Sequence, residues 1–159
     1  MFEEKFGNDY LMKVRQRYWI HMGGRSLNTF RPFLEKKSPR QIMEDNPGGC
    51  IRELADTSHF HIDLYGNYIP GLCSGLSISA KDLGKALSEH RYPVITTLAN
   101  LGIKGIVRLA RKEFAYSPAR SGYINKCDLC TEIRTFLAKK DFEGFPDLNP
   151  KGFYLNMTQ

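Results

Sequence analysis

The sequence predicts an α+β fold: a small β-hairpin with several helices around a four-cysteine metal centre. Apolar and polar residues alternate after Ser58, which is typical of a half-buried strand. Apolar residues recur at helical spacing after Pro93, and four cysteines are spread along the chain. The 159 residues match one domain, and 42% of them are apolar, which is enough to form a packed core.

The first third of the chain predicts short elements. Residues 18–22 have the composition of a strand. Ser38 is a good helix N-cap, and the proline after it suits the first helical position, so we expect a helix that runs to about Asp45. An Asn-Pro-Gly-Gly stretch breaks this helix directly before Cys50.

The middle of the chain predicts the hairpin. Residues 60–64 alternate between apolar and polar side chains, and residues 65–67 have the composition of a tight turn. Residues 68–69 begin the return strand. A Pro-Gly break then leads to Cys73, which we therefore expect just past the end of the hairpin.

The second half of the chain predicts helices. Their expected positions are 81–89, 94–101 with a stop at Gly102, 106–114, and a helix that begins at or just after the Cys-x-x-Cys pair at 127–130. The residues from Asp141 onward are rich in Phe, Pro, Gly and Asn. We expect them to form an irregular segment over the surface.

Composition and charge exclude several classes of partner. No apolar run approaches the roughly 18 residues that span a bilayer, and the acidic Glu3 and Glu4 stand where a signal peptide has a basic region. We therefore expect a cytoplasmic protein without a membrane partner. The formal net charge is +6, but the basic residues are scattered and no nucleic-acid-reading motif flanks them. We expect a solvated basic surface and no nucleic-acid partner.

The cysteines are the residues most suited to carry chemistry. In a reducing cytosol, a Cys-x-x-Cys pair indicates metal binding or redox chemistry more often than disulfides. Cys127 and Cys130 lie at the start of a helix, whose positive end favours thiolates. Cys50 and Cys73 follow glycine breaks, where the backbone can turn a side chain inward. One four-ligand centre would use every cysteine.

The spacing of the cysteines favours one type of metal centre over another. Zinc sites made of four cysteines usually contain two close pairs, and this chain has only one. We therefore favour a [4Fe–4S] cluster, with Zn²⁺ as the alternative. Two other interpretations stay open: a redox pair, although no βαβ setting is visible for it, and buried cysteines without a ligand role.

Two histidines form a second, weaker candidate site. His59 and His61 share a face of the predicted strand, and Asp63 follows in the same series. An exposed strand face is the favoured interpretation. If a histidine is functional, we expect it to contact the cluster ligands or a substrate, with Asp63 as its hydrogen-bonding partner.

The cysteines and the hairpin together resemble a known arrangement. Cys50, the hairpin sequence Ile62-Asp63-x-x-Gly66-Asn67, Cys73 and the later Cys-x-x-Cys resemble the auxiliary-cluster region of radical SAM proteins, of the SPASM or shorter twitch type. In that family a cysteine precedes such a hairpin and a second cysteine follows its return strand. A Cys-x-x-Cys pair then completes the ligands of a [4Fe–4S] cluster.

The resemblance implies a site and a role. Cys50, Cys73, Cys127 and Cys130 would bind the cluster, which anchors substrate or relays electrons beside a barrel that cleaves S-adenosyl-L-methionine. Residues 1–49 resemble the end of such a barrel, 50–140 would be the auxiliary cluster-binding domain, and 141–159 an irregular C-terminal tail.

The resemblance also has limits. The Cys-x-x-x-Cys-x-x-Cys motif of the SAM-cleaving cluster is absent, and a full SPASM region has more cysteines than these four. The chain alone is therefore not expected to be catalytic, and its partner would be a radical SAM barrel in the same parent chain or in a separate subunit. The alternative function is a zinc-stapled, non-enzymatic binding module with a basic surface.

Overall fold

A computed structural model describes residues 2–59 and 61–157. About half of the chain is helical, and a two-stranded antiparallel sheet accompanies the helices, so the α+β class is confirmed. The elements are α1 (Phe2–Phe6), α2 (Tyr10–Arg17), α3 (Arg25–Phe30), the 3₁₀ helix η1 (Arg31–Phe33), α4 (Pro39–Asp45), α5 (Ile51–Leu54), β1 (Asn67–Tyr68), β2 (Ile78–Ser79), the 3₁₀ helix η2 (Ala80–Asp82), α6 (Pro93–Phe114), α7 (Lys126–Lys140) and α8 (Lys151–Asn156).

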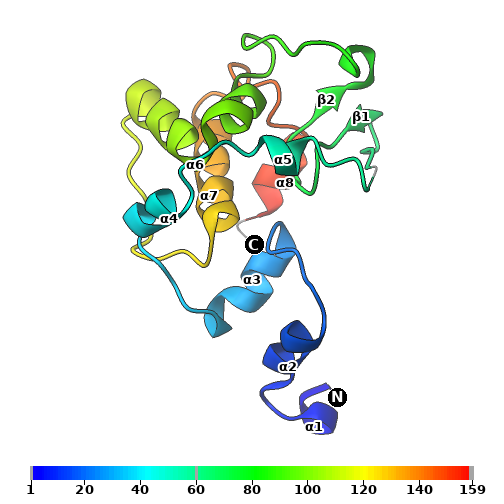
Figure 1. Ribbon diagram of the computed structural model, residues 1–159, viewed down its shortest axis with the longest axis vertical. Coiled ribbons are helices and arrows are strands. Elements are labelled where there is room, and N and C mark those ends of the chain that lie inside the picture. The colour runs from blue at the N-terminus through cyan, green and yellow to red at the C-terminus, as the bar shows by residue number, and fades with distance from the viewer. Residues whose placement is uncertain (1, 60, 158–159) are drawn as a thin grey trace.

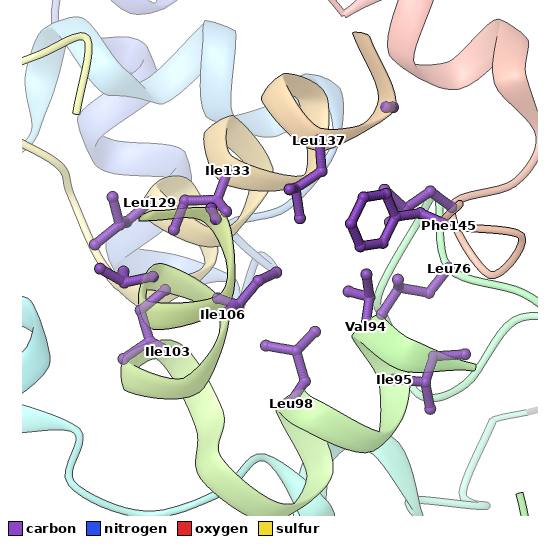
Figure 2. Packing of buried hydrophobic residues seen from close by; sticks show 14 of the residues in the cluster. Leu76, Val94, Ile95, Leu98, Ile103, Ile106, Leu129, Ile133, Leu137 and Phe145 are labelled. Atoms are coloured by element: carbon purple, nitrogen blue, oxygen red, sulfur yellow. The ribbon is translucent and has the colours of Figure 1, made fainter. Parts of the chain in front are cut away.

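The main core lies between α6 and α7. Leu129, Ile133 and Leu137 recur every fourth residue, so they form one face of α7. Figure 2 shows this face opposite Ile103 and Ile106 of α6, and all five side chains are at most 1% exposed. Full burial of one such side chain contributes about 1.5–3 kcal/mol, so this pair of helices is the scaffold on which the other segments are placed.

Helix α6 contains a break at Gly102. The backbone of Gly102 has φ 60° and ψ −148°, a conformation that favours glycine, and the helix resumes directly afterwards. A Cβ atom at Gly102 would lie 2.2 Å from the carbonyl oxygen of Gly48, and one at Gly49 would lie 2.0 Å from that of Ala99. The prediction that a helix stops at Gly102 is confirmed, and the loop before Cys50 crosses α6 at this point.

Two predicted helices are confirmed with their N-terminal caps. Ser38 accepts a hydrogen bond from the backbone of Gln41, and the Gln41 side chain accepts one from the backbone of Ser38, which completes a capping box before α4. Asn125 accepts a hydrogen bond from the backbone N–H of Asp128 and caps α7, at the start of which the Cys-x-x-Cys pair lies.

The predicted hairpin forms, but it is short. Ile62 makes an isolated antiparallel bridge with Tyr68, and the N–H groups of Asp63 and Ile69 donate 2.9 and 3.0 Å hydrogen bonds across the turn, while β1 also pairs with β2. Phe60 lies outside the described residues. Leu64 is fully exposed, so the alternating pattern of 60–64 does not correspond to a buried face. Cys73 follows this short hairpin, as predicted, and lies in the loop between β1 and β2.

Three further predictions of local structure are wrong. Residues 18–22 form no strand, and 81–89 contain only the 3₁₀ helix η2, because Gly84 adopts φ 75° and interrupts any longer helix. The C-terminal segment is not an irregular surface layer. It contains α8, and Leu148 and Tyr154 are buried in the main core.

The N-terminal region extends away from the main core. Figure 1 shows α1 and α2 as an arm beyond α3, with α6 and α7 at the other end of the molecule. Met22, Leu27 and Phe30 form a second small core of their own. No helix in the described part of the chain is long and apolar enough to cross a membrane.

Candidate metal site

All four cysteines line one cavity of about 220 Å³. They reach it from different elements: Cys50 precedes α5, Cys73 lies in the loop between β1 and β2, and Cys127 and Cys130 lie at the start of α7. The structure therefore brings together the four residues on which the sequence-based prediction depends. Their role as ligands stays a prediction.

The main chain holds Cys50 against α6. Its N–H donates a 2.7 Å hydrogen bond to the carbonyl oxygen of Leu98. This carbonyl belongs to the last turn of α6 before the break at Gly102. Because neither Gly49 nor Gly102 has a side chain, the loop approaches closely enough to form this bond.

The main chain also holds Cys73 close to α5. Gly71 adopts φ 55°, and a Cβ atom there would lie 2.0 Å from the carbonyl oxygen of Glu53 in α5. Only glycine fits this contact without displacement. Since α5 begins directly after Cys50, the two isolated cysteines share one small scaffold on the rim of the cavity.

The thiols interact electrostatically with one another. Burial raises the pKa of Cys73 to about 11 and that of Cys127 to about 12, and burial also raises the pKa of Cys50. A negative charge on Cys130 would raise the pKa of each of these three thiols further. Without a bound cation the three thiols therefore keep their protons, and a bound cation would reverse this preference.

A buried guanidinium faces the same cavity. Arg134 is 5% exposed and lines the cavity one helical turn after Cys130. It donates a 2.8 Å hydrogen bond to the carbonyl oxygen of Ser74 and a 3.2 Å bond to the hydroxyl of Tyr154. Burial alone would lower the pKa of Arg134, but Tyr154 and the thiols of Cys130 and Cys73 raise it overall.

The charge of Arg134 has no direct partner in the described residues. Its Nε atom is buried without a hydrogen-bond partner, and no carboxylate there lies within 4.0 Å of the guanidinium. The sequence analysis missed this residue. The available signal was its spacing, since a residue four positions after Cys130 lies on the same face of a helix.

The rim of the cavity is polar and partly aromatic. Lys126 donates a hydrogen bond to the carboxylate of Glu53 and joins α7 to α5 there. Trp19 and His21 reach the rim from the N-terminal region, and burial lowers the pKa of His21. Apolar side chains complete the lining: Leu54, Leu72, Leu98 and Ile103.

A cluster of ion pairs outside the cavity lining contacts the start of α7. The carboxylate of Asp128 is fully buried and accepts 2.8 Å hydrogen bonds from both Arg31 and Arg120. Arg120 also pairs with Glu132 at 2.9 Å. Arg31 belongs to η1, so this cluster connects the N-terminal region to the helix that carries two of the cysteines.

The structure does not bring the predicted histidine site to the cavity. His59 and His61 stack with ring centroids 6.3 Å apart, both are exposed, and neither lines the cavity. The predicted pairing of a histidine with Asp63 is wrong, because the Asp63 carboxylate accepts 2.9 Å bonds from the backbone N–H groups of Tyr65 and Asn67 and stabilises the turn.

The arrangement of ligating groups is open. Over residues 2–59 and 61–157, no three His, Cys, Asp or Glu side chains lie close enough together to hold a single metal ion. The four cysteines instead line the cavity from three separate parts of the chain. Soft thiol donors, an apolar lining and a buried cation together fit an anionic, sulfur-rich metal cluster.

Comparison of the chain with protein-family models, with curated proteins and with solved structures finds no match. Its function is therefore inferred from the residues around the cavity.

Proposed function

We propose that the chain binds a [4Fe–4S] cluster through Cys50, Cys73, Cys127 and Cys130. The observation that supports this most is the single cavity that all four thiols line. Its volume of about 220 Å³ is large compared with the roughly 10–15 Å³ that one water requires, so a group of several atoms suits it better than one ion. Four cysteines are a complete ligand set for such a cluster.

The chain would contribute the surroundings of the cluster. When bound, the cluster supplies a centre for one-electron transfer or for contact with a substrate. Leu54, Leu98 and Ile103 line the cavity beside the thiols, and these apolar side chains would lower the local dielectric around a bound cluster and strengthen charge interactions with it. The loop contacts at Gly49 and Gly71 hold the isolated thiols in position.

The biological role that we propose is that of an auxiliary-cluster domain, similar to those of radical SAM proteins. It would anchor a substrate or relay electrons beside a barrel in the same parent chain or in another subunit. Trp19 and His21 on the rim of the cavity support this proposal, because they come from the region whose sequence resembles the end of such a barrel.

The decisive experiment is anaerobic purification followed by analysis of iron, acid-labile sulfide and zinc. We expect about four irons and four sulfides per chain and an absorption band near the visible range that dithionite bleaches. Stoichiometric zinc without sulfide would contradict the proposal and favour the zinc-stapled module, for which four thiolates are also suitable ligands.

Single substitutions test the ligand set. Cys73→Ser keeps the size of the side chain but removes a soft donor, so we expect it to lose most of the iron and sulfide after reconstitution. Thr135→Ser is the matched control, because it lies on α7 but does not line the cavity. Full cluster content in Cys73→Ser would remove this residue from the ligand set.

A further inference from the structure

Within residues 2–59 and 61–157, Arg134 forms no ion pair with a carboxylate. A buried, unpaired cation is costly, and proteins normally place a carboxylate beside it. Here the hydrogen-bond partners of the guanidinium are all uncharged: a carbonyl oxygen of Ser74 and the hydroxyls of Tyr154 and Thr131. Arginine does not lose its proton in proteins, so the positive charge persists inside the cavity.

The carboxylates near the cavity form no ion pair with Arg134. Burial raises the pKa of Asp147 overall and Arg134 lowers it in part, but the Asp147 carboxylate lies beyond ion-pair distance and accepts its 2.7 Å hydrogen bond from the N–H of Ile95 at the start of α6. Glu53 on the rim is paired with Lys126. The groups that remain beside the guanidinium are sulfurs, and Cys130 lies within its hydrogen-bonding reach.

We infer that Arg134 is a positioning residue that supplies the counter-charge for the cluster and raises its reduction potential. The inference rests on the proposed function and adds an electrostatic role to it. A [4Fe–4S] cluster with four thiolates carries net negative charge, and one-electron reduction adds one more negative charge. A fixed cation beside a sulfur stabilises the reduced form more than the oxidised form, and a low dielectric strengthens the effect.

The test is a redox titration of the reconstituted full chain with dithionite as the one-electron reductant. In Arg134→Gln the amide can still donate hydrogen bonds, but the charge is gone. We expect the ratio of oxidised to reduced cluster at a fixed potential to rise at least tenfold, which lowers the midpoint by about 59 mV for a one-electron couple. Arg134→Lys keeps the charge and should stay within threefold of the unaltered protein.

The matched control is Lys139→Gln, an exposed lysine on the same helix outside the cavity lining, which should leave the midpoint unchanged. A midpoint in Arg134→Gln equal to that of the unaltered protein would overturn the inference. If Arg134→Gln fails to fold, the inference is tested with Arg134→Lys. A tenfold change in the ratio of oxidised to reduced cluster in Arg134→Lys would show that this residue acts through its hydrogen-bond geometry and not through its charge.

A second measurement separates this role from ordinary packing. Thermal unfolding is compared for the metal-free and the reconstituted forms of the unaltered protein and of Arg134→Gln. A counter-charge predicts a larger loss of stability in the reconstituted form, because only that form contains the anion. Equal losses in both forms would overturn the inference. If the unaltered protein takes up neither iron nor sulfide, the proposed function itself fails.

Discussion

At the scale of single residues, the position of Cys50 depends on a glycine that has no space for a side chain. A Cβ atom at Gly49 would lie 2.0 Å from the carbonyl oxygen of Ala99 in α6. Gly49→Ala should therefore push the loop away and weaken the hydrogen bond from Cys50 to Leu98. We expect the free energy of unfolding to fall by about 2 kcal/mol, measured by denaturant titration, together with lower cluster content.

The neighbouring glycine provides the control for this prediction. A Cβ atom at Gly48 would meet no atom within 4 Å, so Gly48→Ala should change the stability by less than about 0.5 kcal/mol. If the two variants behave alike, close contact with α6 is not what places Cys50.

The site residues differ in how far the sequence could reveal them. The four cysteines stand out by type and number, and their gathering around one cavity follows from glycine breaks that are visible in the sequence. Arg134 is one of many basic residues in the chain. Its burial beside Cys130 depends on how α7 packs against the loop at Ser74 and against Tyr154 of α8, and no local pattern encodes these contacts.

At the scale of elements, the segment between α7 and α8 places a carboxyl group against the start of α6, and this group should make stability depend on pH. Asp147 is fully buried, one of its oxygens has no hydrogen-bond partner, and burial raises its pKa to about 6. Folding thus raises this pKa from 3.8. The contribution to stability is complete below about pH 4 and is lost as the pH rises through 6, with an upper size of about 3 kcal/mol.

Asp147→Asn tests this prediction because it stays neutral and keeps an oxygen that can accept from Ile95. Denaturant unfolding of both proteins should be measured between pH 4 and 7.5. We expect the variant to become more stable relative to the unaltered protein as the pH rises across this interval. A constant difference between the two curves would contradict the raised pKa.

Helices that begin with a cap formed by neighbouring residues could be predicted from the sequence. Elements that are stabilised by residues far away in the sequence could not. The capping box of Ser38 and Gln41 and the cap at Asn125 lie within a few residues of the helices that they start. The alternation of 60–64 is also local, but a strand needs a neighbour: Ile62 makes a single bridge with Tyr68, and β1 has the distant residues 78–79 as its strand partner. Similarly, α8 is stabilised by burial of Tyr154 in the main core.

At the scale of the whole molecule, the cavity lies at the edge of the main core, where loops from several segments meet α6 and α7. If the proposed cluster binds there, its removal by a chelator and an oxidant should loosen these loops while the α6–α7 core persists. Hydrogen exchange followed by mass spectrometry should show faster exchange in peptides covering 48–56 and 70–75, and unchanged exchange around Ile133. Uniformly faster exchange would instead indicate global unfolding.

The ion pair between Arg31 and Asp128 connects the N-terminal region to α7. Asp128→Asn removes the charge that Arg31 and Arg120 share, and both arginines are partly exposed, so we expect a loss of about 2 kcal/mol in denaturant unfolding. Glu44→Gln is the control, since its exposed pair with Arg40 is screened by solvent and its loss should leave the denaturant midpoint unchanged. Equal effects would show that the buried cluster does not hold this region.

The distribution of the cysteines along the chain has a consequence for biogenesis. The first thiol, Cys50, is synthesised long before Cys130, and the hydrogen bond from its N–H requires the Leu98 carbonyl of α6. Contacts between residues so distant in sequence form late in folding. Insertion of the proposed cluster would therefore have to wait until translation has passed the end of α7, and metal captured earlier by the Cys-x-x-Cys pair alone would lack half of the proposed ligands.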